Sequence, residues 1–356
     1  MRLKKVKSLS CLCIFLGLLV ILTGCPKTAK REDIIKPKGM VYFTFFDTVS
    51  YVYSYKGDSQ KDFEARCKGV SDILSEYHSL FNIYYDFEGV NNLKTVNDNA
   101  GKEPVKVDRK LIDFLLYAKQ MHDVTNGEMN VMMGSVLKLW HDCRTEASAA
   151  PSKAHIPSRD KLEEAAKHTD ISLLEIDEKN LTVFISDPEA RIDAGALGKG
   201  YATEMAADHL RSVGADSYVL NIGGNIRIIG HKQDGGSWGT GIKDPADTSR
   251  YATIIDIADT SCVTSGDYER FFSVNGKRYH HVIDKDTLMP SEHFSSVTII
   301  TANSGLADAL STALFSMSYE DGLNLINMMS ISVEVLWISH DGTQRYTPGF
   351  ENLIKK

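Results

Sequence analysis

The first 25 residues constrain the fold most, because they decide in which compartment the chain folds. They read MRLKKVKSLSCLCIFLGLLVILTGC, with four basic residues, an apolar run over 9–22 and small residues before Cys25. This order is typical of an export signal, and the apolar run is short for crossing about 30 Å of hydrocarbon. We therefore predict that the mature chain folds outside the cytoplasm.

Residues 22–25, LTGC, resemble the lipobox of bacterial lipoproteins, in which the cysteine is acylated and becomes the first residue. The resemblance implies a signal peptide at 1–24 and a lipid-anchored, polar and turn-rich tether at 25–40. It also implies a location on the periplasmic side of a bacterial membrane. An ordinary signal peptide with a chance cysteine at position 25 is the alternative.

The mature chain has few cysteines and an acidic balance. Cys67, Cys143 and Cys262 are spaced too widely for a disulfide framework or a zinc site, so the fold must rest on its hydrophobic core. Without residues 1–24, Lys and Arg fall from 40 to 36 while Asp and Glu stay at 47, so the formal charge changes from −7 to −11. No basic block remains, and no nucleic-acid partner is expected.

Hydrophobic patterning predicts more strands than helices. Apolar residues at helical spacing predict helices at 62–80, at 111–122, from Lys199 to Gly214, and at 304–317 with Ser304 as the N-cap. Strands or hairpins are expected at 41–55, 171–186, 218–222, 226–229 and 297–301. Residues 144–170, which contain Pro151 and Pro157, are expected to form a surface excursion. Because strands seldom alternate regularly with helices, we predict the α+β class.

The stretch DAGALGKGYATE at 193–204 suggests a phosphate cradle, although its spacing matches neither a Walker loop nor a dinucleotide fingerprint. Its small residues let a ligand approach the backbone closely. The helix that begins near Lys199 offers free N–H groups and the positive end of its dipole. A tight strand-to-helix turn with a solvated lysine explains the stretch equally well.

Several linked stretches resemble, in order, the signatures of the ApbE family of flavin transferases. They are TNGEMNVMMGSVLKLW at 125–140, DAGALGKGYATE at 193–204, NIGGNIR at 221–227, TSGDYER at 264–270, HHVID at 280–284 and ADALST at 307–312. The resemblance implies an α+β, T-fold-like domain of mixed or antiparallel sheets, forming one catalytic unit at 41–356. It implies an Mg²⁺-dependent enzyme that transfers FMN from FAD to a threonine hydroxyl of acceptor proteins, such as membrane redox-pump subunits, and releases AMP.

The resemblance also implies which residues form the site. The FAD contacts would be Phe46, Tyr84, Glu128, Met129, Asn130, Asp193, Lys199 and Ile283. The metal would be held by the Ala196 carbonyl, Asp308 and Thr312. Two departures concern the flavin pocket: residues 81–89 lack the usual Ser-Thr-Tyr pattern beside Tyr84, and Asn130 replaces a common aspartate.

The residue types of the metal set make chemical sense. Asp308 and Thr312 are four apart, so both would project from one helix face, and hard oxygen ligands suit Mg²⁺. Alternatively, Asp308 complements the helix N-terminus and Thr312 fills the core. His281 beside Asp284 would orient or deprotonate a nucleophile, or else be a structural histidine. Trp140 could stack on flavin but follows an apolar run, which favours a core position.

Two functions are therefore weighed. The first is an FMN transferase that could also hydrolyse FAD to FMN and AMP, because a metal and phosphate site does not by itself exclude water. The second is a lipoprotein that captures or carries FAD without chemistry.

Overall fold

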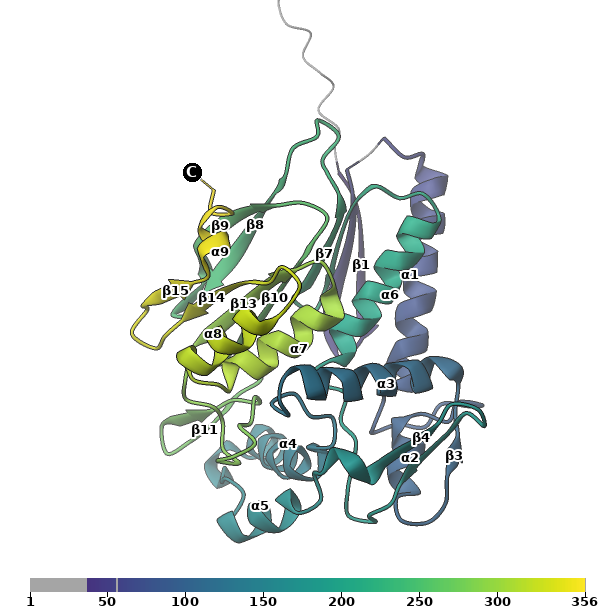
Figure 1. Cartoon of the computed structure of the whole chain (residues 1–356), viewed down its shortest axis with the longest axis vertical. Coiled ribbons are helices and arrows are strands. Elements are labelled where there is room, and N and C mark those ends of the chain that lie inside the picture. Colours follow the sequence, from purple (N-terminus) through teal and green to yellow (C-terminus); the bar gives the residue numbers. More distant parts are fainter. Residues whose placement is uncertain (1–36, 56, 356) are drawn as a thin grey trace, which may run out of the picture. The chain divides into compact units, whose positions relative to one another are not determined.

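An eight-stranded sheet forms the centre of the protein (Figure 1). The computed structural model describes residues 37–55 and 57–355. In spatial order the strands are β1 (Lys38–Phe45), β2 (Thr48–Ser54), β6 (Ser217–Ile222), β7 (Asn225–Gly230), β10 (Ser261–Gly266), β13 (Ser296–Thr301), β14 (Glu334–Ile338) and β15 (Gln344–Tyr346). All neighbouring strands are antiparallel, which confirms the predicted α+β class.

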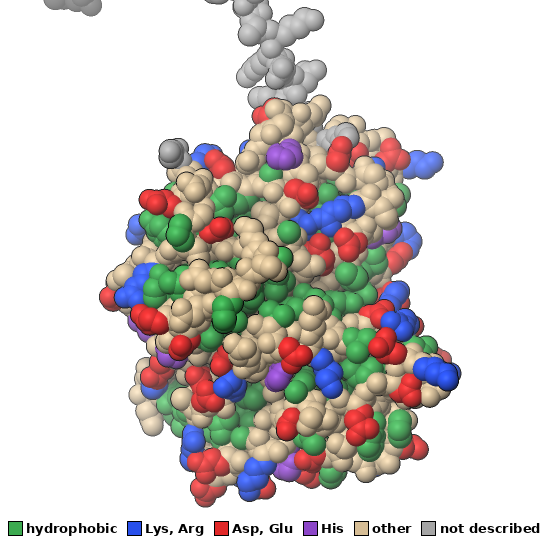
Figure 2. All heavy atoms as spheres, in the orientation of Figure 1, with side chains coloured by type: hydrophobic (Ala, Val, Ile, Leu, Met, Phe, Trp, Pro, Cys, Tyr) green, Lys and Arg blue, Asp and Glu red, His purple; other side chains and the backbone are tan. Residues whose placement is uncertain are grey.

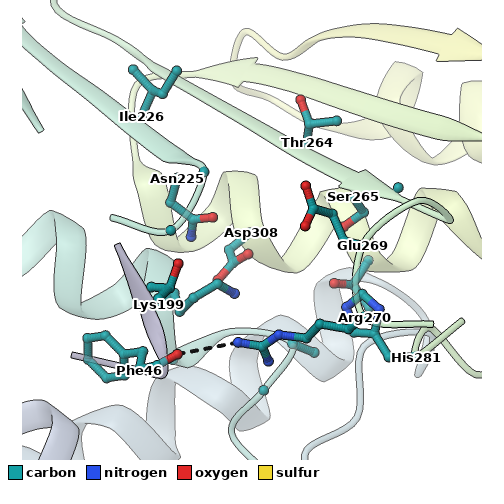
Figure 3. A pocket seen from close by; sticks show the side chains of 18 of the residues that line it. Phe46, Lys199, Asn225, Ile226, Thr264, Ser265, Glu269, Arg270, His281 and Asp308 are labelled. Atoms are coloured by element: carbon teal, nitrogen blue, oxygen red, sulfur yellow. Dashed lines mark hydrogen bonds and ion pairs between the residues drawn. The ribbon is translucent and has the colours of Figure 1, made fainter. Parts of the chain in front are cut away.

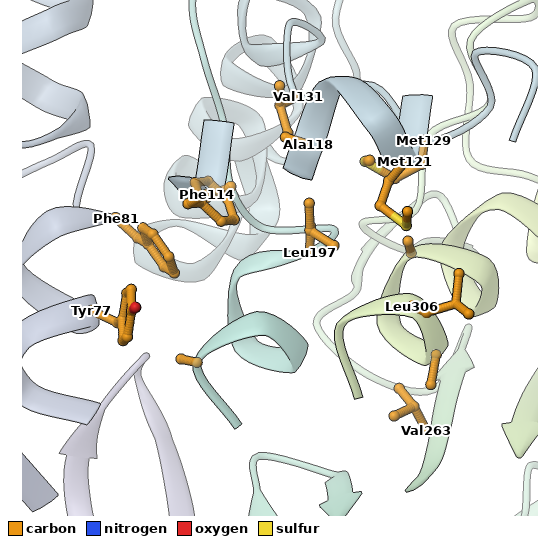
Figure 4. Close-up of a cluster of buried hydrophobic side chains, with 14 of the residues drawn as sticks. Tyr77, Phe81, Phe114, Ala118, Met121, Met129, Val131, Leu197, Val263 and Leu306 are labelled. Atoms are coloured by element: carbon orange, nitrogen blue, oxygen red, sulfur yellow. The ribbon is translucent and has the colours of Figure 1, made fainter. Parts of the chain in front are cut away.

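Helices cover one face of this sheet. They are α1 (Gln60–Leu80), α6 (Gly198–Ser212), α7 (Ser304–Phe315) and α8 (Tyr319–Met328). Sheet residues such as Val263, Ile299 and Val335 pack with these helices and with α3 (Arg109–Val124) in the main core. Figure 4 shows part of that core, where Tyr77 and Phe81 of the α1 end approach Phe114 of α3. The ring centroids of Phe81 and Phe114 lie 4.0 Å apart, and both rings contact Tyr201 in the first turn of α6.

The opposite face of the sheet carries a hairpin, β8 (Trp238–Asp244) and β9 (Asp247–Ile257), together with α9 (Pro348–Glu351). Cys262, Ile300 and Leu336 are each adjacent in sequence to a main-core residue and belong to this second cluster, since strand side chains alternate between faces. All six residues of β13 are buried because the strand is covered on both sides.

A smaller part of the domain is built from the segments between α1 and α6. It contains α2 (Leu93–Asp98), α4 (Gly134–Ala149), α5 (Arg159–Ala166) and the sheet β3 (Val105–Lys106), β5 (Thr182–Ile185), β4 (Leu174–Asp177). The hairpin β11 (Phe272–Val274) and β12 (Lys277–Tyr279) packs with α4 and α5 in a third cluster. Residues 144–170 therefore include the end of α4 and all of α5, and are not a mere surface excursion. Helix α5 is amphipathic but short, and Leu162 is its single fully buried residue.

The predicted boundaries shift slightly. Strand β1 begins at Lys38, so the last residues of the predicted tether belong to the sheet. Helix α7 ends at Phe315, and its N-cap is Asn303, whose side chain accepts from the Leu306 N–H, instead of Ser304. The signal peptide and Cys25 lie outside the described residues. Among the helices described, none is long and apolar enough to cross a membrane.

The face of the molecule shown in Figure 2 mixes acidic and basic side chains without a continuous basic area. This distribution agrees with the negative formal charge of the chain.

Candidate functional site

One cavity of about 1140 Å³ collects the predicted site residues. It is lined by the start of α6, the side of α7, the β1–β2 turn, the hairpin β8–β9 and the loops around 82–84, 128–133 and 265–283. Figure 3 shows Lys199, Asp308 and His281 among the side chains around it. Every residue predicted to contact FAD or metal lines it, as does His281: Phe46, Tyr84, Glu128, Met129, Asn130, Asp193, Ala196, Lys199, His281, Ile283, Asp308 and Thr312. Segments up to about 260 residues apart in sequence thus meet at one place.

The start of α6 presents positive charge to the cavity. The N-cap residue Leu197 has no side-chain capping bond, and Lys199 lines the cavity with its Nζ 3.9 Å from Asp308 Oδ2. The cap of α6 comes from α7 instead, because the Gly200 N–H donates to Asp308 Oδ2 at 2.8 Å. A helix start with a lysine beside it is suited to phosphate oxygens.

Three oxygen groups line the cavity together with Lys199. Because the Gly200 N–H binds Asp308, it does not make the helical bond to the Ala196 carbonyl, which accepts no hydrogen bond within residues 37–55 and 57–355. Asp308 has its second oxygen, Oδ1, and Thr312 its hydroxyl, without a hydrogen-bond partner among those same residues. All three groups line the cavity.

These three oxygens fit the predicted metal. A carboxylate, a hydroxyl and a carbonyl are hard ligands, and Mg²⁺ characteristically combines one or two carboxylates with waters and substrate phosphates. The described residues contain no group of three His, Cys, Asp or Glu side chains that could enclose an ion. The residues present therefore suit an ion that shares its coordination sphere with a phosphate ligand.

The opposite side of the cavity carries an aromatic and basic group. Tyr84 is 47% exposed, stacks on His141 at 4.9 Å, and its hydroxyl lies 3.2 Å from His141 Nδ1. Arg144 of α4 donates to the same nitrogen at 3.1 Å. Asn82 accepts from the N–H groups of Tyr84 and Tyr85, so it shapes the turn that presents the ring.

Two guanidinium groups in the cavity have no carboxylate within 4.0 Å among the described residues. Arg144 is one, and burial together with the nearby Arg270 lowers its pKa. Arg270 is the other, and it donates to the Phe46 carbonyl at 3.3 Å across the cavity (Figure 3). Phe46 occupies the β1–β2 turn with a φ of 53° and is held from the other side by His78 Nδ1. The side chains of Arg144 and Arg270 are thus available to an anion.

Asp193 lies close to this positive charge. Its carboxylate accepts from the Gly195 N–H at 2.7 Å. Burial raises its pKa, against the opposing effect of His141, Arg270 and Arg144. Asp193 therefore shapes the small-residue turn at 193–197 and balances part of the charge of the guanidinium groups.

His281 is neutral at physiological pH. Burial, reinforced by Arg270 and Lys199, lowers its pKa to about 3. Its Nδ1 is buried and has no hydrogen-bond partner among the described residues. A neutral imidazole with a free nitrogen in a cavity can accept a proton.

The structure does not bring Asp284 into the cavity with His281. Its Oδ1 accepts from the backbone N–H groups of Asp286 and Thr287 at 2.8 Å each, so it closes a turn. The predicted pairing of His281 with Asp284 is therefore not found, because the carboxylate is used by its own loop.

The stretch 128–130 serves both the cavity and the fold. Glu128 pairs with Lys285 at 3.3 Å, and burial raises the pKa of its carboxyl. Met129 is fully buried in the main core. Asn130 donates to the Thr169 carbonyl and accepts from the Met132 N–H, a combination that an ionised aspartate could not make. Trp140, predicted as a core residue, is 3% exposed and donates to the Leu288 carbonyl, although it also lines the cavity.

Sequence reasoning missed three residues of the site. Arg270 was available in the stretch TSGDYER but was not singled out. His141 follows Trp140, which was predicted as a core residue, and Arg144 begins the predicted surface excursion. No local sequence pattern marks either residue as part of a site. Their place beside Tyr84 and Asp193 arises only from the tertiary packing of α4.

Comparison with known proteins identifies relatives of this chain. The ApbE family profile matches residues 46–337. The FAD:protein FMN transferase of Treponema pallidum is 32% identical over 278 residues, covering 74% of this chain and 75% of the relative. That of Vibrio cholerae is 28% identical over 351 residues, covering 96% and 98%.

Solved structures agree in fold. The ApbE protein of Thermotoga maritima superposes with a TM-score of 0.78 at 28% identity, covering 90% of this chain and all of that one. The flavin transferase ApbE of Vibrio cholerae gives a TM-score of 0.73 at 25% identity, covering 89% and 100%.

Proposed function

The chain belongs to the ApbE family, and from this membership we propose that it is an FAD:protein FMN transferase. It would transfer FMN from FAD to a threonine hydroxyl of an acceptor protein and release AMP. One observation carries the proposal: one cavity is lined by a lysine at a helix start, a neutral histidine, and three oxygens that have no hydrogen-bond partner in the described part of the chain. These are the groups needed to bind a pyrophosphate and activate a hydroxyl toward it.

Asp308, Thr312 and the Ala196 carbonyl would hold Mg²⁺. When bound, the ion would supply neutralising charge for the pyrophosphate. Lys199 would hold phosphate oxygens and fix their orientation, through its ammonium group and through its own backbone N–H at the start of α6. Arg144 and Arg270 would add positive charge from the other side of the cavity.

The transfer step balances as a substitution at phosphorus. The threonine oxygen forms a bond to the phosphorus of the FMN half, and the bond from that phosphorus to the bridging oxygen breaks. AMP leaves with the bridging oxygen. The hydroxyl proton would pass to His281, whose buried Nδ1 has no hydrogen-bond partner among the described residues. The negative charge of a phosphate bound in the cavity would raise the basicity of this imidazole.

Hydrolysis of FAD to FMN and AMP follows from the same site when water takes the place of threonine. Transfer requires the acceptor to exclude water and to place its hydroxyl in line with the leaving group. The exposed Tyr84 shows that the cavity is open on this side in the free protein. We therefore expect slow hydrolysis without acceptor.

Passive capture of FAD is the second candidate, and chromatography separates the two. Purified protein is incubated with FAD, with and without Mg²⁺, and the products are analysed for FMN and AMP. Metal-dependent AMP supports catalysis, whereas tight FAD binding with no product over hours supports capture. Adding membranes from cells that lack this protein tests transfer, since covalent flavin appears as fluorescent protein bands after denaturation.

The location of the enzyme is a separate proposal. A lipid on Cys25 would hold the domain at the periplasmic side of the membrane, beside acceptors such as membrane redox-pump subunits. Labelling cells with a radioactive fatty acid tests it: the protein should be labelled, and Cys25→Ser should not.

A further inference from the structure

Helices α6 and α7 meet at their first turns, and each supplies a carboxylate to the start of the other. The Gly200 N–H donates to Asp308 Oδ2 at 2.8 Å, and the Ser304 N–H donates to Glu204 Oε2 at 2.6 Å. Residues 200 and 204 are one turn apart, as are 304 and 308, so each pair lies on one helix face. The two contacts thus form a reciprocal pair in which each helix caps the other.

The two helices are too close at Gly200 for any larger residue. A Cβ at this position would lie 2.4 Å from Asp308 Cβ and 2.4 Å from the Ser304 carbonyl oxygen. Carbon atoms in good contact are about 3.5–4.0 Å apart. The reciprocal capping therefore depends on glycine at 200, and the separation of the helices is fixed at this point.

The two carboxylates differ in their remaining contacts. Glu204 is 5% exposed, and it is bound by Arg227 at 3.2 Å and Arg211 at 3.2 Å besides the Ser304 N–H. Arg227, on β7, is itself 3% exposed. Asp308 is also buried but lines the cavity, and only its Oδ2 is engaged within the described part of the chain.

We propose that Glu204 is a positioning residue for the metal and phosphate end of the cavity. It does not line the cavity. By binding the Ser304 N–H and Arg227 together, it locks the first turn of α7 to α6 and to the sheet. This lock sets the position of Asp308, one turn further along α7, relative to Ala196 and Lys199.

A stabilising role alone would not require this arrangement. A buried ion pair contributes little net stability compared with apolar residues of the same size, because both charges lose their hydration. What an apolar residue could not do is accept the Ser304 N–H and so fix the start of α7. The inference rests on the proposed function, in which Asp308 and Ala196 hold Mg²⁺.

The test compares three variants of the full chain. Glu204→Gln keeps the size of the side chain and an oxygen for the Ser304 N–H but loses the charge that holds Arg227. Glu204→Ala removes both. Asp58→Asn is the matched control, because Asp58 binds Arg66 at 2.8 Å and accepts from Ser54, yet does not line the cavity.

Two quantities are measured for each folded variant: Mn²⁺ affinity by electron paramagnetic resonance, and the Mg²⁺ concentration that gives half-maximal AMP release. Loss of groups that orient metal ligands typically weakens binding by about 10–100-fold. We expect that range for Glu204→Ala, a smaller loss for Glu204→Gln, and less than twofold for Asp58→Asn. The maximal rate at saturating Mg²⁺ should fall much less than the affinity.

The outcomes separate this inference from the proposed function. If the wild-type chain binds Mn²⁺ and both Glu204 variants bind it within twofold, the positioning role is rejected and the enzyme assignment stands. If the Asp58 control loses affinity equally, the effect is general destabilisation and the inference is again rejected. If the wild-type chain neither binds Mn²⁺ nor responds to Mg²⁺, the metal assignment and the inference both fail.

Discussion

The two sides of the cavity are built in opposite ways. The helix-start side, formed by Gly198, Lys199 and Asp308, rests on the first turns of α6 and α7. These turns are joined by the bonds from the Gly200 N–H to Asp308 and from the Ser304 N–H to Glu204, and both carboxylates are buried. The loop side, formed by Tyr84, His141, Arg144 and Arg270, has an exposed aromatic ring and two guanidinium groups without a carboxylate partner in the described structure.

The difference shows which groups of the cavity are held in position before a ligand binds. Groups that meet a metal and a pyrophosphate must be held in position before the ligand arrives, because their contribution depends on geometry. Groups that meet a flavin ring and an entering protein can remain adjustable. Changes on the helix-start side should therefore affect the chemical step, whereas changes on the loop side should affect ligand binding. The following predictions test this division.

The largest effect is expected from Asp308→Ala. This variant removes the only carboxylate of the predicted metal set and the cap of Gly200. We expect Mg²⁺-dependent AMP release from FAD to fall by about 100-fold or more. Asp187→Asn, which alters a carboxylate paired with His168 outside the cavity, is the control. Full activity of Asp308→Ala would refute the metal assignment.

Arg144→Met should weaken FAD binding without weakening the fold. A hydrogen bond to a charged group contributes about 1.5–3 kcal/mol, so the dissociation constant should rise by roughly 10–100-fold. The midpoint of thermal unfolding should stay constant or rise, because Arg144 is half-buried beside the like charge of Arg270 and has no carboxylate within 4.0 Å among the described residues. Flavin fluorescence and calorimetry measure the two quantities.

Arg159→Met makes the same change of charge at a surface ion pair with Glu163. It should leave FAD affinity unchanged. A fall in stability of Arg144→Met as large as its loss of affinity would show that the loop side is structural after all.

The lowered pKa of His281 predicts that the free energy of unfolding depends on pH. Its pKa is about 3 in the folded chain, below the ordinary value of 6.5, so the unfolded chain binds the proton more readily. Its contribution to stability is present above pH 6.5 and is lost as the pH falls from 6.5 toward 3. Between pH 7 and pH 5 the loss should be about 2 kcal/mol at most.

Urea unfolding of the wild-type chain and of His281→Gln at both pH values isolates this effect. The variant should lose less stability on acidification, by up to that amount. An equal loss in both proteins would mean that the imidazole is more accessible to water than the structure shows.

The smallest effect is expected from Tyr84→Phe. It removes the contact of the hydroxyl with His141 but keeps the ring that stacks on it. We expect FAD affinity to change by less than about fivefold, since an exposed hydrogen bond contributes about 1 kcal/mol or less. Asn82→Tyr should do more, because it removes the acceptor that shapes the turn under Tyr84. A larger effect of Tyr84→Phe than of Asn82→Tyr would contradict this order.

The fold was predictable where one face of an element is consistently apolar. Helices α1 and α3 and strands β6, β7 and β13 show their period in the sequence and lie within a few residues of their expected places. The hairpin β8–β9 and helix α5 were not predicted. The segment WGTGIKD is rich in glycine, and α5 buries little beyond Leu162, so neither has a strong local signal.

The residues that line the cavity were predictable from the sequence, but the contacts that hold them in place were not. Linked stretches of sequence indicated Lys199, Asp308 and Ala196, and the structure places them together. The reciprocal capping by Glu204 was not visible, because a glutamate within a helix has no unusual local pattern. Asp284 was misplaced for the converse reason: adjacency to His281 in sequence does not bring its side chain into the cavity.

The three cysteines of the described chain have a practical consequence. Cys67 lies in the main core, Cys262 in the cluster under β8–β9, and Cys143 in the cluster of α4 and α5. Each thiol is free and buried, and burial raises the pKa of Cys67 to about 11 and of Cys262 to about 12. A thiol reagent can reach each one only when its own cluster opens. Mass spectrometry can follow the labelling rate at each of the three positions. These rates therefore report the opening of the three clusters separately, without any engineered probe.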